Sequence, residues 1–192
     1  MDADTIKWLT KSELEAFFKA IPRRTKQGKR DRALFYTVYR HGLRVSEATT
    51  LRIEDIDSER LRLMVRRQKG SYGGEYPLSP DVWKAIKATL ATRDDDNPYL
   101  FLSNRGTPLH RSTAFRMFQN YATEAGIPID KRHPHVLKHS IATHLMESNE
   151  DIAVVRDWLG HRNIQNTMVY AKITSRQRDQ VGRRMDSSTS VL

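Results

Sequence analysis

Three short segments in the C-terminal half carry side chains that can bind a phosphate and attack it. His135 and Lys138 lie three residues apart, His161 follows a Leu-Gly pair, and Tyr170 comes nine positions later. A tyrosine hydroxyl has an ordinary pKa of about 10 and is a weak nucleophile, so it needs a proton acceptor and positive donors for the oxygens that gain charge. Imidazoles and an ammonium group supply both. The spacing therefore predicts a phosphate site with a tyrosine nucleophile.

The composition of the chain favours a polyanionic partner. Its 192 residues suffice for one domain, and 33 Lys and Arg against 23 Asp and Glu give a net charge of +10. Double-stranded DNA, bound largely through its phosphates, is the expected partner. No apolar run approaches the roughly 18 residues of a membrane span, so we expect a soluble, cytoplasmic protein without membrane contact.

No metal or other cofactor is expected. The chain has no cysteine, which removes disulfides, thiolate catalysis and Cys-bound zinc. It also has neither a Walker-type phosphate loop nor a His-Glu-x-x-His motif. His135, His139 and His144 lack an obvious carboxylate or cysteine partner, and Asp94 to Asp96 are typical of a solvated loop.

The first half of the chain predicts helices that precede a hairpin. Thr10 and Glu13 form a capping-box pattern at the start of a helix. The basic segment 23–30 is typical of a solvated loop, and an apolar helix is expected over 33–39. A short helix is expected over 45–51.

A β-hairpin is predicted next. Apolar and polar residues alternate over 60–66, which is the period of a half-buried strand, and 75–78 can return as its partner. The turn between them places Lys69 near the tip. Ser79 followed by a proline then predicts the start of a helix.

The second half predicts three further helices and a turn. One helix has Phe115 on its apolar face and ends at Gly126, and the next begins at His135. A third is expected over 152–159, followed by a turn over 167–171 that presents Tyr170.

These elements predict a mainly α-helical fold with a small antiparallel β-sheet. We expect residues 1–185 to form one catalytic domain and residues 186–192 to be a disordered tail.

The marker residues resemble those of the tyrosine recombinase (phage integrase) family, in order and near the usual separations. The resemblance covers about the whole chain from Leu9 to Lys172. Its segments are Gly42-Leu-Arg44-Val-Ser-Glu47, Lys69-Gly70, Pro134-His135-Val-Leu-Lys138-His139, Leu159-Gly-His161 and Tyr170.

The resemblance implies a role for each of these residues. Arg44 and Lys138 would hold the scissile phosphate, while His135 and His161 would bond it and support proton movement. Lys69 would protonate the leaving 5′-oxygen, and Tyr170 would form a 3′-phosphotyrosyl link. Glu47 would be the acidic partner of Arg44. The family also implies site-specific recombination or integration of DNA, without ATP or a metal, by a homotetramer assembled on DNA.

One residue departs from the family pattern, which is His-x-x-Arg where this chain has His135-Val-Leu-Lys138. A lysine is a point charge, whereas an arginine can grip two phosphate oxygens. We therefore expect a weakened enzyme in which Lys138→Arg speeds cleavage. A catalytically impaired DNA-binding protein of the same fold and a type IB topoisomerase-like activity stay open as alternatives.

The chain lacks the N-terminal helical domain of most relatives, so it is expected to be either a fragment or a single-domain member. Segments 99–104 and 159–164 are similar to those of the single-domain fimbrial-switch invertases, which favours the short form. Further cations are expected to contact the DNA backbone. These are Lys26, Lys29, Arg30, Arg66, Arg67 and Arg162.

Overall fold

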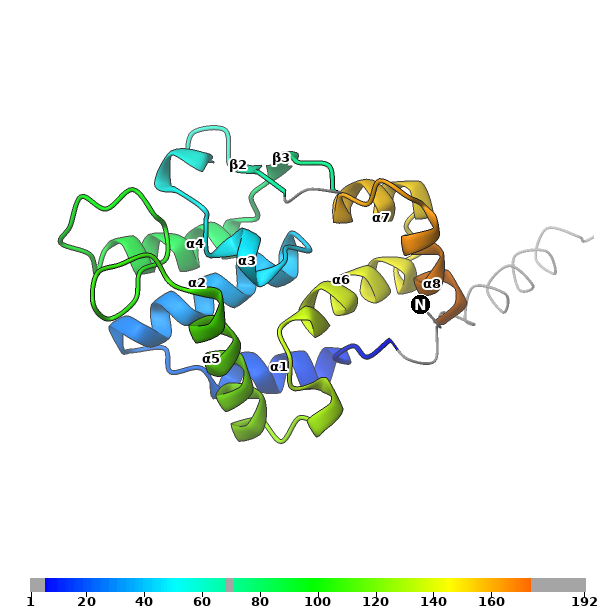
Figure 1. Ribbon diagram of the computed structural model, residues 1–192, viewed down its shortest axis with the longest axis horizontal. Coiled ribbons are helices and arrows are strands. Elements are labelled where there is room, and N and C mark those ends of the chain that lie inside the picture. Colours follow the sequence, from blue (N-terminus) through cyan, green and yellow to red (C-terminus); the bar gives the residue numbers. More distant parts are fainter. Residues whose placement is uncertain (1–5, 68–70, 174–192) are drawn as a thin grey trace, which may run out of the picture.

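Helices form most of the structure, and a small sheet lies at one edge of them (Figure 1). A computed structural model describes residues 6–67 and 71–173. Several expectations lie outside these residues: the hairpin tip with Lys69, the extension of the domain to residue 185, and the tail 186–192. The mainly helical fold with a small antiparallel sheet is confirmed.

The first helix begins where its capping signal predicts. Helix α1 spans Lys11–Ala20, and the Thr10 hydroxyl accepts a hydrogen bond from the Glu13 N–H at 3.2 Å. The Glu13 carboxylate accepts in return from the Thr10 N–H at 2.7 Å. Two N–H groups at the helix start are thereby satisfied.

The second helix begins earlier than predicted. Helix α2 spans Lys26–Arg40, so the solvated loop expected over 23–30 is wrong for its second half. Thr25 caps the helix by accepting from the Gly28 N–H at 3.0 Å. A side chain at position 28 would lie 1.8 Å from the Pro22 carbonyl oxygen, so the glycine permits a tight entry into the helix. The short helix α3 follows at Val45–Ala48.

The predicted hairpin is confirmed within a three-stranded antiparallel sheet. Strand β2 spans Arg62–Val65 and pairs with β3, Gly74–Pro77, so that Leu63 faces Tyr76. A further strand that was not predicted, β1 at Ile56–Asp57, pairs with β2 on the other side. It is too short to carry a periodic pattern.

The remaining helices follow the sheet. Helix α4 begins at the predicted Ser79 cap, and α6 begins at His135 as expected. The turn expected over 167–171 is wrong, because these residues lie inside a helix. The bounds are α4 Pro80–Leu90, α5 Arg111–Glu124, α6 His135–Glu147, α7 Ile152–Leu159 and α8 Gln165–Ile173, with short 3-10 helices at Ile53–Asp55 and Ile129–Lys131.

Two apolar clusters meet along α6. The larger contains Phe17, Phe35 and Phe118 from α1, α2 and α5, together with the first turn of α6. The smaller joins the rest of α6 to α7 and α8 and includes the Tyr170 ring. Polar residues on the first two turns of α6 therefore lie where the two clusters join. Within the described residues, none of the helices is long and apolar enough to cross a membrane.

Candidate active site

Arg44 precedes α3 and is held by a carboxylate one turn later. Glu47 accepts from the Arg44 backbone N–H and from its Nη1, each at 2.8 Å. Nη1 also donates to the Ser71 hydroxyl at 3.1 Å, and 37% of the Arg44 side chain is exposed. Glu47 itself is buried. The carboxylate therefore fixes one edge of a guanidinium whose other part reaches the surface.

Glu47 is kept ionised by the groups around it. Burial by itself raises the pKa of its carboxyl, but the Arg44 N–H bond and the charges of Arg67 and Lys138 outweigh this and lower the pKa overall. The role of acidic partner expected for Glu47 matches this geometry.

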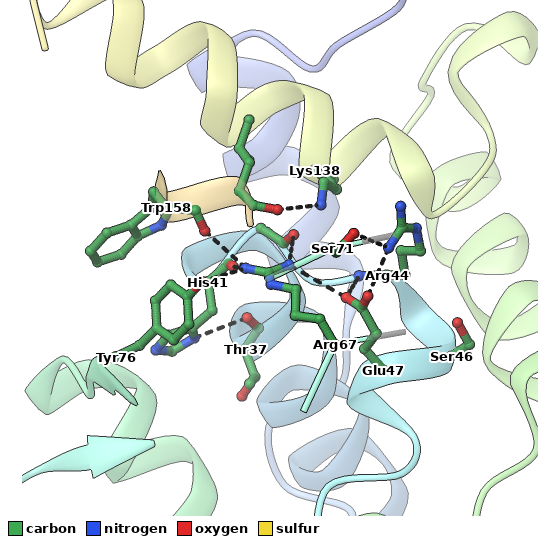
Figure 2. A network of polar contacts seen from close by, with 12 residues as sticks. Thr37, His41, Arg44, Ser46, Glu47, Arg67, Ser71, Tyr76, Lys138 and Trp158 are labelled. Carbon is green, nitrogen blue, oxygen red and sulfur yellow. Dashed lines mark hydrogen bonds and ion pairs between the residues drawn. The ribbon is translucent and has the colours of Figure 1, made fainter. Parts of the chain in front are cut away.

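Lys138 and two histidines project from the beginning of α6. Lys138 is buried, and its Nζ donates to the Leu159 carbonyl at 2.9 Å (Figure 2). The rings of His135 and His139, one turn apart, pack edge to face with centroids 4.5 Å apart. The helix thus carries three polar groups on its first two turns, of which Lys138 and His139 are buried and His135 is exposed.

His161 follows the end of α7 and lies close to Arg44. Its Nδ1 lies 3.0 Å from the Thr167 hydroxyl, and its backbone bridges to Ser71, the residue that accepts from Arg44. Gly160 lets the chain reverse here because it adopts the left-handed φ of 66°.

Gly160→Ala is expected to destabilise the fold through close contacts as well as through the left-handed backbone conformation of this residue. A methyl group there would lie 2.5 Å from the Tyr72 carbonyl oxygen and 2.7 Å from Arg67 Nε. Gly126 has a similar φ of 69° with open space around it, so Gly126→Ala is the matched control. Urea unfolding should give a loss of about 1 kcal/mol for the control and about 3 kcal/mol for Gly160→Ala. Equal losses would contradict the close contact.

Tyr170 contacts this set of residues through a histidine and not through one of the cations. The hydroxyl of this buried residue is 2.7 Å from His139 Nδ1, one helical turn beyond His135. Burial raises the pKa of the phenol above its ordinary value. In this arrangement the hydroxyl is protonated and contacts His139.

The imidazoles are neutral at physiological pH. Partial desolvation of the ring, then the charges of Lys138 and Arg44, lowers the pKa of His135 and of His161 to about 4 each. Burial, then the neighbouring His135, lowers the pKa of His139 to about 3. Direct contacts bring these residues together, because Arg44 and the His161 backbone both meet Ser71, and Lys138 bonds the carbonyl two residues before His161. Five of the six predicted catalytic residues thus lie on neighbouring segments, and the sixth, Lys69, is outside the described residues.

An open groove of about 860 Å³ adjoins Arg44 and His135. Its other wall is α5, with Arg111, Phe115 and Arg116. Phe115 is 40% exposed, so the inward position expected for it is wrong. Sequence reasoning missed Arg111 and Arg116 as candidate DNA contacts. Arg111 shares a helix face with Phe115, four residues later, and Arg116 borders that face, so the pattern along α5 could have indicated them.

The predicted DNA contacts divide by exposure. Arg66 is 63% exposed and pairs with Asp55, and Arg162 is exposed and covers the Tyr72 ring. Arg67 differs, because its side chain is 0% exposed and cannot contact DNA in this structure. An arginine in a run of basic residues is typical of a surface position, which is why the sequence predicted a DNA contact for Arg67.

The other basic cluster lies at the far end of α2 from Arg44. Lys26 is exposed and Lys29 is partly exposed. Arg30 is turned inward instead: it pairs with Asp31 at 2.7 Å and donates to the Leu102 carbonyl at 2.8 Å. Most of its guanidinium donors are therefore used within the protein, to hold a loop.

The described residues contain no group of three or more His, Cys, Asp or Glu side chains arranged for a metal. His139 contacts Tyr170, and His144 is also buried, with its Nδ1 2.9 Å from the Tyr39 hydroxyl. Asp95 pairs with Arg93.

Comparison with known proteins connects this geometry to a family. A family model described as "Phage integrase family" matches residues 7–177. Tyrosine recombinase XerA of Thermococcus onnurineus is 39% identical over 171 residues, covering 88% of this chain and 58% of XerA. Type 1 fimbriae regulatory protein FimE of Escherichia coli is 34% identical over 169 residues, covering 85% of this chain and 84% of FimE. The chain thus spans less than two thirds of the XerA protein.

Solved structures agree on the fold. XerA recombinase superposes with a TM-score of 0.78 and 28% identity, covering 92% of this chain and 62% of that one. XerH recombinase, in a post-cleavage complex with its difH substrate, gives a TM-score of 0.79 at 24% identity, covering 93% and 53%. The match over residues 7–177, the similarity to FimE and the shared fold agree: the chain belongs to the phage integrase family, whose relatives named here include tyrosine recombinases.

Proposed function

We propose that this protein is a site-specific recombinase that cuts and rejoins double-stranded DNA with Tyr170 as its nucleophile. The observation that carries the proposal is the meeting of Arg44, Lys138 and His161 from three distant segments beside an open groove. Such a group of donors can stabilise the charge that develops on the phosphate oxygens.

The bond exchange leaves atoms and charges balanced. The Tyr170 oxygen bonds to phosphorus while the bond to the 5′-oxygen breaks, which leaves a 3′-phosphotyrosyl link. The phenolic proton passes to neutral His135, and Lys69 gives the leaving oxygen a proton. The number of ester bonds stays constant, so a second DNA end can later attack the link without an added energy source.

Tyr170 must first leave its contact with His139. The hydroxyl is buried in the smaller cluster and contacts His139, so we expect it to move before it attacks a phosphate. We expect α8 to shift when DNA fills the groove and brings a phosphate to Arg44. Exchange between two duplexes requires two cuts on each, so the acting assembly is expected to be a homotetramer on DNA.

A covalent adduct on nicked DNA tests the proposal. A pool of duplexes with a randomised core and a nick allows the short leaving strand to diffuse away, so that the phosphotyrosyl link accumulates. The expected result is a DNA band that is shifted on a denaturing gel and removed by proteinase treatment. If no such band forms from any pool while the protein retains salt-sensitive DNA binding, the recombinase proposal is wrong.

Lys138→Arg is expected to speed adduct formation, increasingly so above pH 7. Burial, then the charge of Arg67, lowers the pKa of Lys138 to about 7, so its positive charge is lost as the pH rises. In the protein without DNA, only about a tenth of the Lys138 side chains would be charged at pH 8, whereas a guanidinium stays charged. The measurement is the adduct rate at low DNA concentration from pH 6 to 9.

Lys84→Arg, an exposed change on α4, is the control and should alter nothing. A slower reaction with Lys138→Arg at every pH would mean that the bond from Lys138 to Leu159 requires a lysine.

That same bond favours a second candidate function, a DNA-binding protein of this fold without catalysis. Lys138 is buried and donates one hydrogen bond to the Leu159 carbonyl, so fewer of its N–H groups can bind a phosphate. This candidate predicts salt-sensitive DNA binding without any adduct.

A further inference from the structure

The last carbonyl groups of α7 are each met by a donor from another segment. The Trp158 oxygen accepts from Arg67 Nη2 at 2.8 Å, and the Leu159 oxygen accepts from Lys138 Nζ at 2.9 Å. The Gly160 oxygen accepts from the Tyr72 N–H at 2.9 Å. The C-terminal end of a helix carries partial negative charge and unsatisfied carbonyl groups, so two buried cations stabilise it. His161 follows directly from this end.

Arg67 also holds the segment that carries Arg44. Its Nη1 donates to the Gly42 carbonyl at 2.9 Å, and its Nη2 donates to the His41 carbonyl at 3.0 Å. It lies 3.4 Å from the Glu47 carboxylate, which in turn holds Arg44 (Figure 2). One guanidinium thus binds both the turn before Arg44 and the turn before His161.

We propose that Arg67 is a positioning residue, which sets the separation of Arg44 and His161 and acts on the phosphate only through them. The inference deepens the proposed function and rests on it. A side chain with 0% exposure has no access to DNA, whereas its five acceptors lie on segments far apart in the sequence. A planar group with several donors in fixed directions suits this task better than a lysine.

The charge of Arg67 also reaches Lys138. Several groups face Lys138, namely Arg67 two residues after β2, Arg44 and Glu47 from the start of α3 and α3 itself, His135 and His139 on α6, and His161 after α7. Arg67 and Arg44 lower the pKa of Lys138, and Glu47 raises it. Removing the Arg67 charge should therefore raise this pKa, an effect that a purely space-filling residue would not have.

Adduct formation by Arg67→Met tests the role. In a single turnover at saturating nicked DNA we expect the rate constant to fall by about 100-fold, the cost of a misplaced reacting group. The dissociation constant for DNA should change by less than about 3-fold, since no phosphate contact is lost. The rate should begin to fall at a higher pH than in the unaltered protein. Arg67→Lys should recover part of the rate. Arg60→Met, an exposed change in the turn before β2, is the matched control and should leave the rate constant unchanged.

Two outcomes overturn the proposal: an unchanged rate constant, or a smaller reacting fraction with an unchanged rate constant, which marks misfolding. If Arg67→Met does not fold, the rate constant and the dissociation constant are measured for Arg67→Lys and Arg67→Gln instead. If the unaltered protein forms no adduct, the proposed function fails separately. NMR titration of Lys138 and of the His161 ring then decides, because unchanged signals in Arg67→Met would refute positioning and shifted ones would support it.

Discussion

Replacing Tyr170 with phenylalanine is expected to abolish the covalent adduct, a loss of at least about 10⁴-fold, because a phenyl ring has no oxygen to attack phosphorus. The ring itself stays in the cluster with Ile141 and Leu159, so the fold should persist. Losing the contact with His139 should cost about 1 kcal/mol in unfolding free energy. Denaturing gels of the nicked-DNA reaction and urea unfolding measure the two effects.

Tyr39→Phe is the matched control for this change. The Tyr39 hydroxyl lies 2.9 Å from His144 Nδ1, as the Tyr170 hydroxyl lies 2.7 Å from His139 Nδ1. Both substitutions remove one tyrosine–histidine contact and should lower stability by similar amounts, about 1 kcal/mol. Only Tyr170→Phe should remove the adduct. An adduct that persists in Tyr170→Phe would assign the nucleophile to another residue.

Two helix starts were predictable because their signals are local. Thr10 with Glu13, and Ser79 before a proline, satisfy N–H groups within one turn, so the sequence itself contains both partners of each contact. Gly160 likewise marks a left-handed residue at the end of α7. The segments that carry Arg44, His135 and His161 could likewise be placed at the ends of helices from the sequence alone.

Positions that depend on distant partners could not be predicted in this way. Arg67 has the sequence surroundings of a surface residue, yet its partners are carbonyl groups at His41 and Trp158. Tyr170 was expected in a turn, because short polar residues around it obscure the pattern of α8, and packing against α6 and α7 decides the outcome. Burial of a charged side chain is a property of the assembled fold.

Arg44 is expected to have the second largest effect. Arg44→Met should slow adduct formation by about 10²- to 10³-fold, the usual result of removing one donor to a developing charge. Glu47 keeps the Arg67 guanidinium at 3.4 Å, so the buried carboxylate does not lose every positive neighbour and the fold should persist. Single-turnover rates at saturating nicked DNA measure the change.

Arg40→Met removes the same charge from an exposed position on α2 and serves as the control, with an adduct rate equal to that of the unaltered protein.

Arg44→Lys separates charge from geometry in the same experiment. A lysine keeps the positive charge but cannot bond Glu47 and a phosphate through a planar fork, so its rate should lie between those of Arg44→Met and the unaltered protein. The dependence of DNA binding on salt should weaken by about one phosphate contact in Arg44→Met and stay unchanged in Arg44→Lys. If Arg44→Met reacts as fast as the unaltered protein, the cation that holds the phosphate is a different one. The groove then leaves Arg111 and Arg116 of α5 as the nearest candidates, because they line its opposite wall.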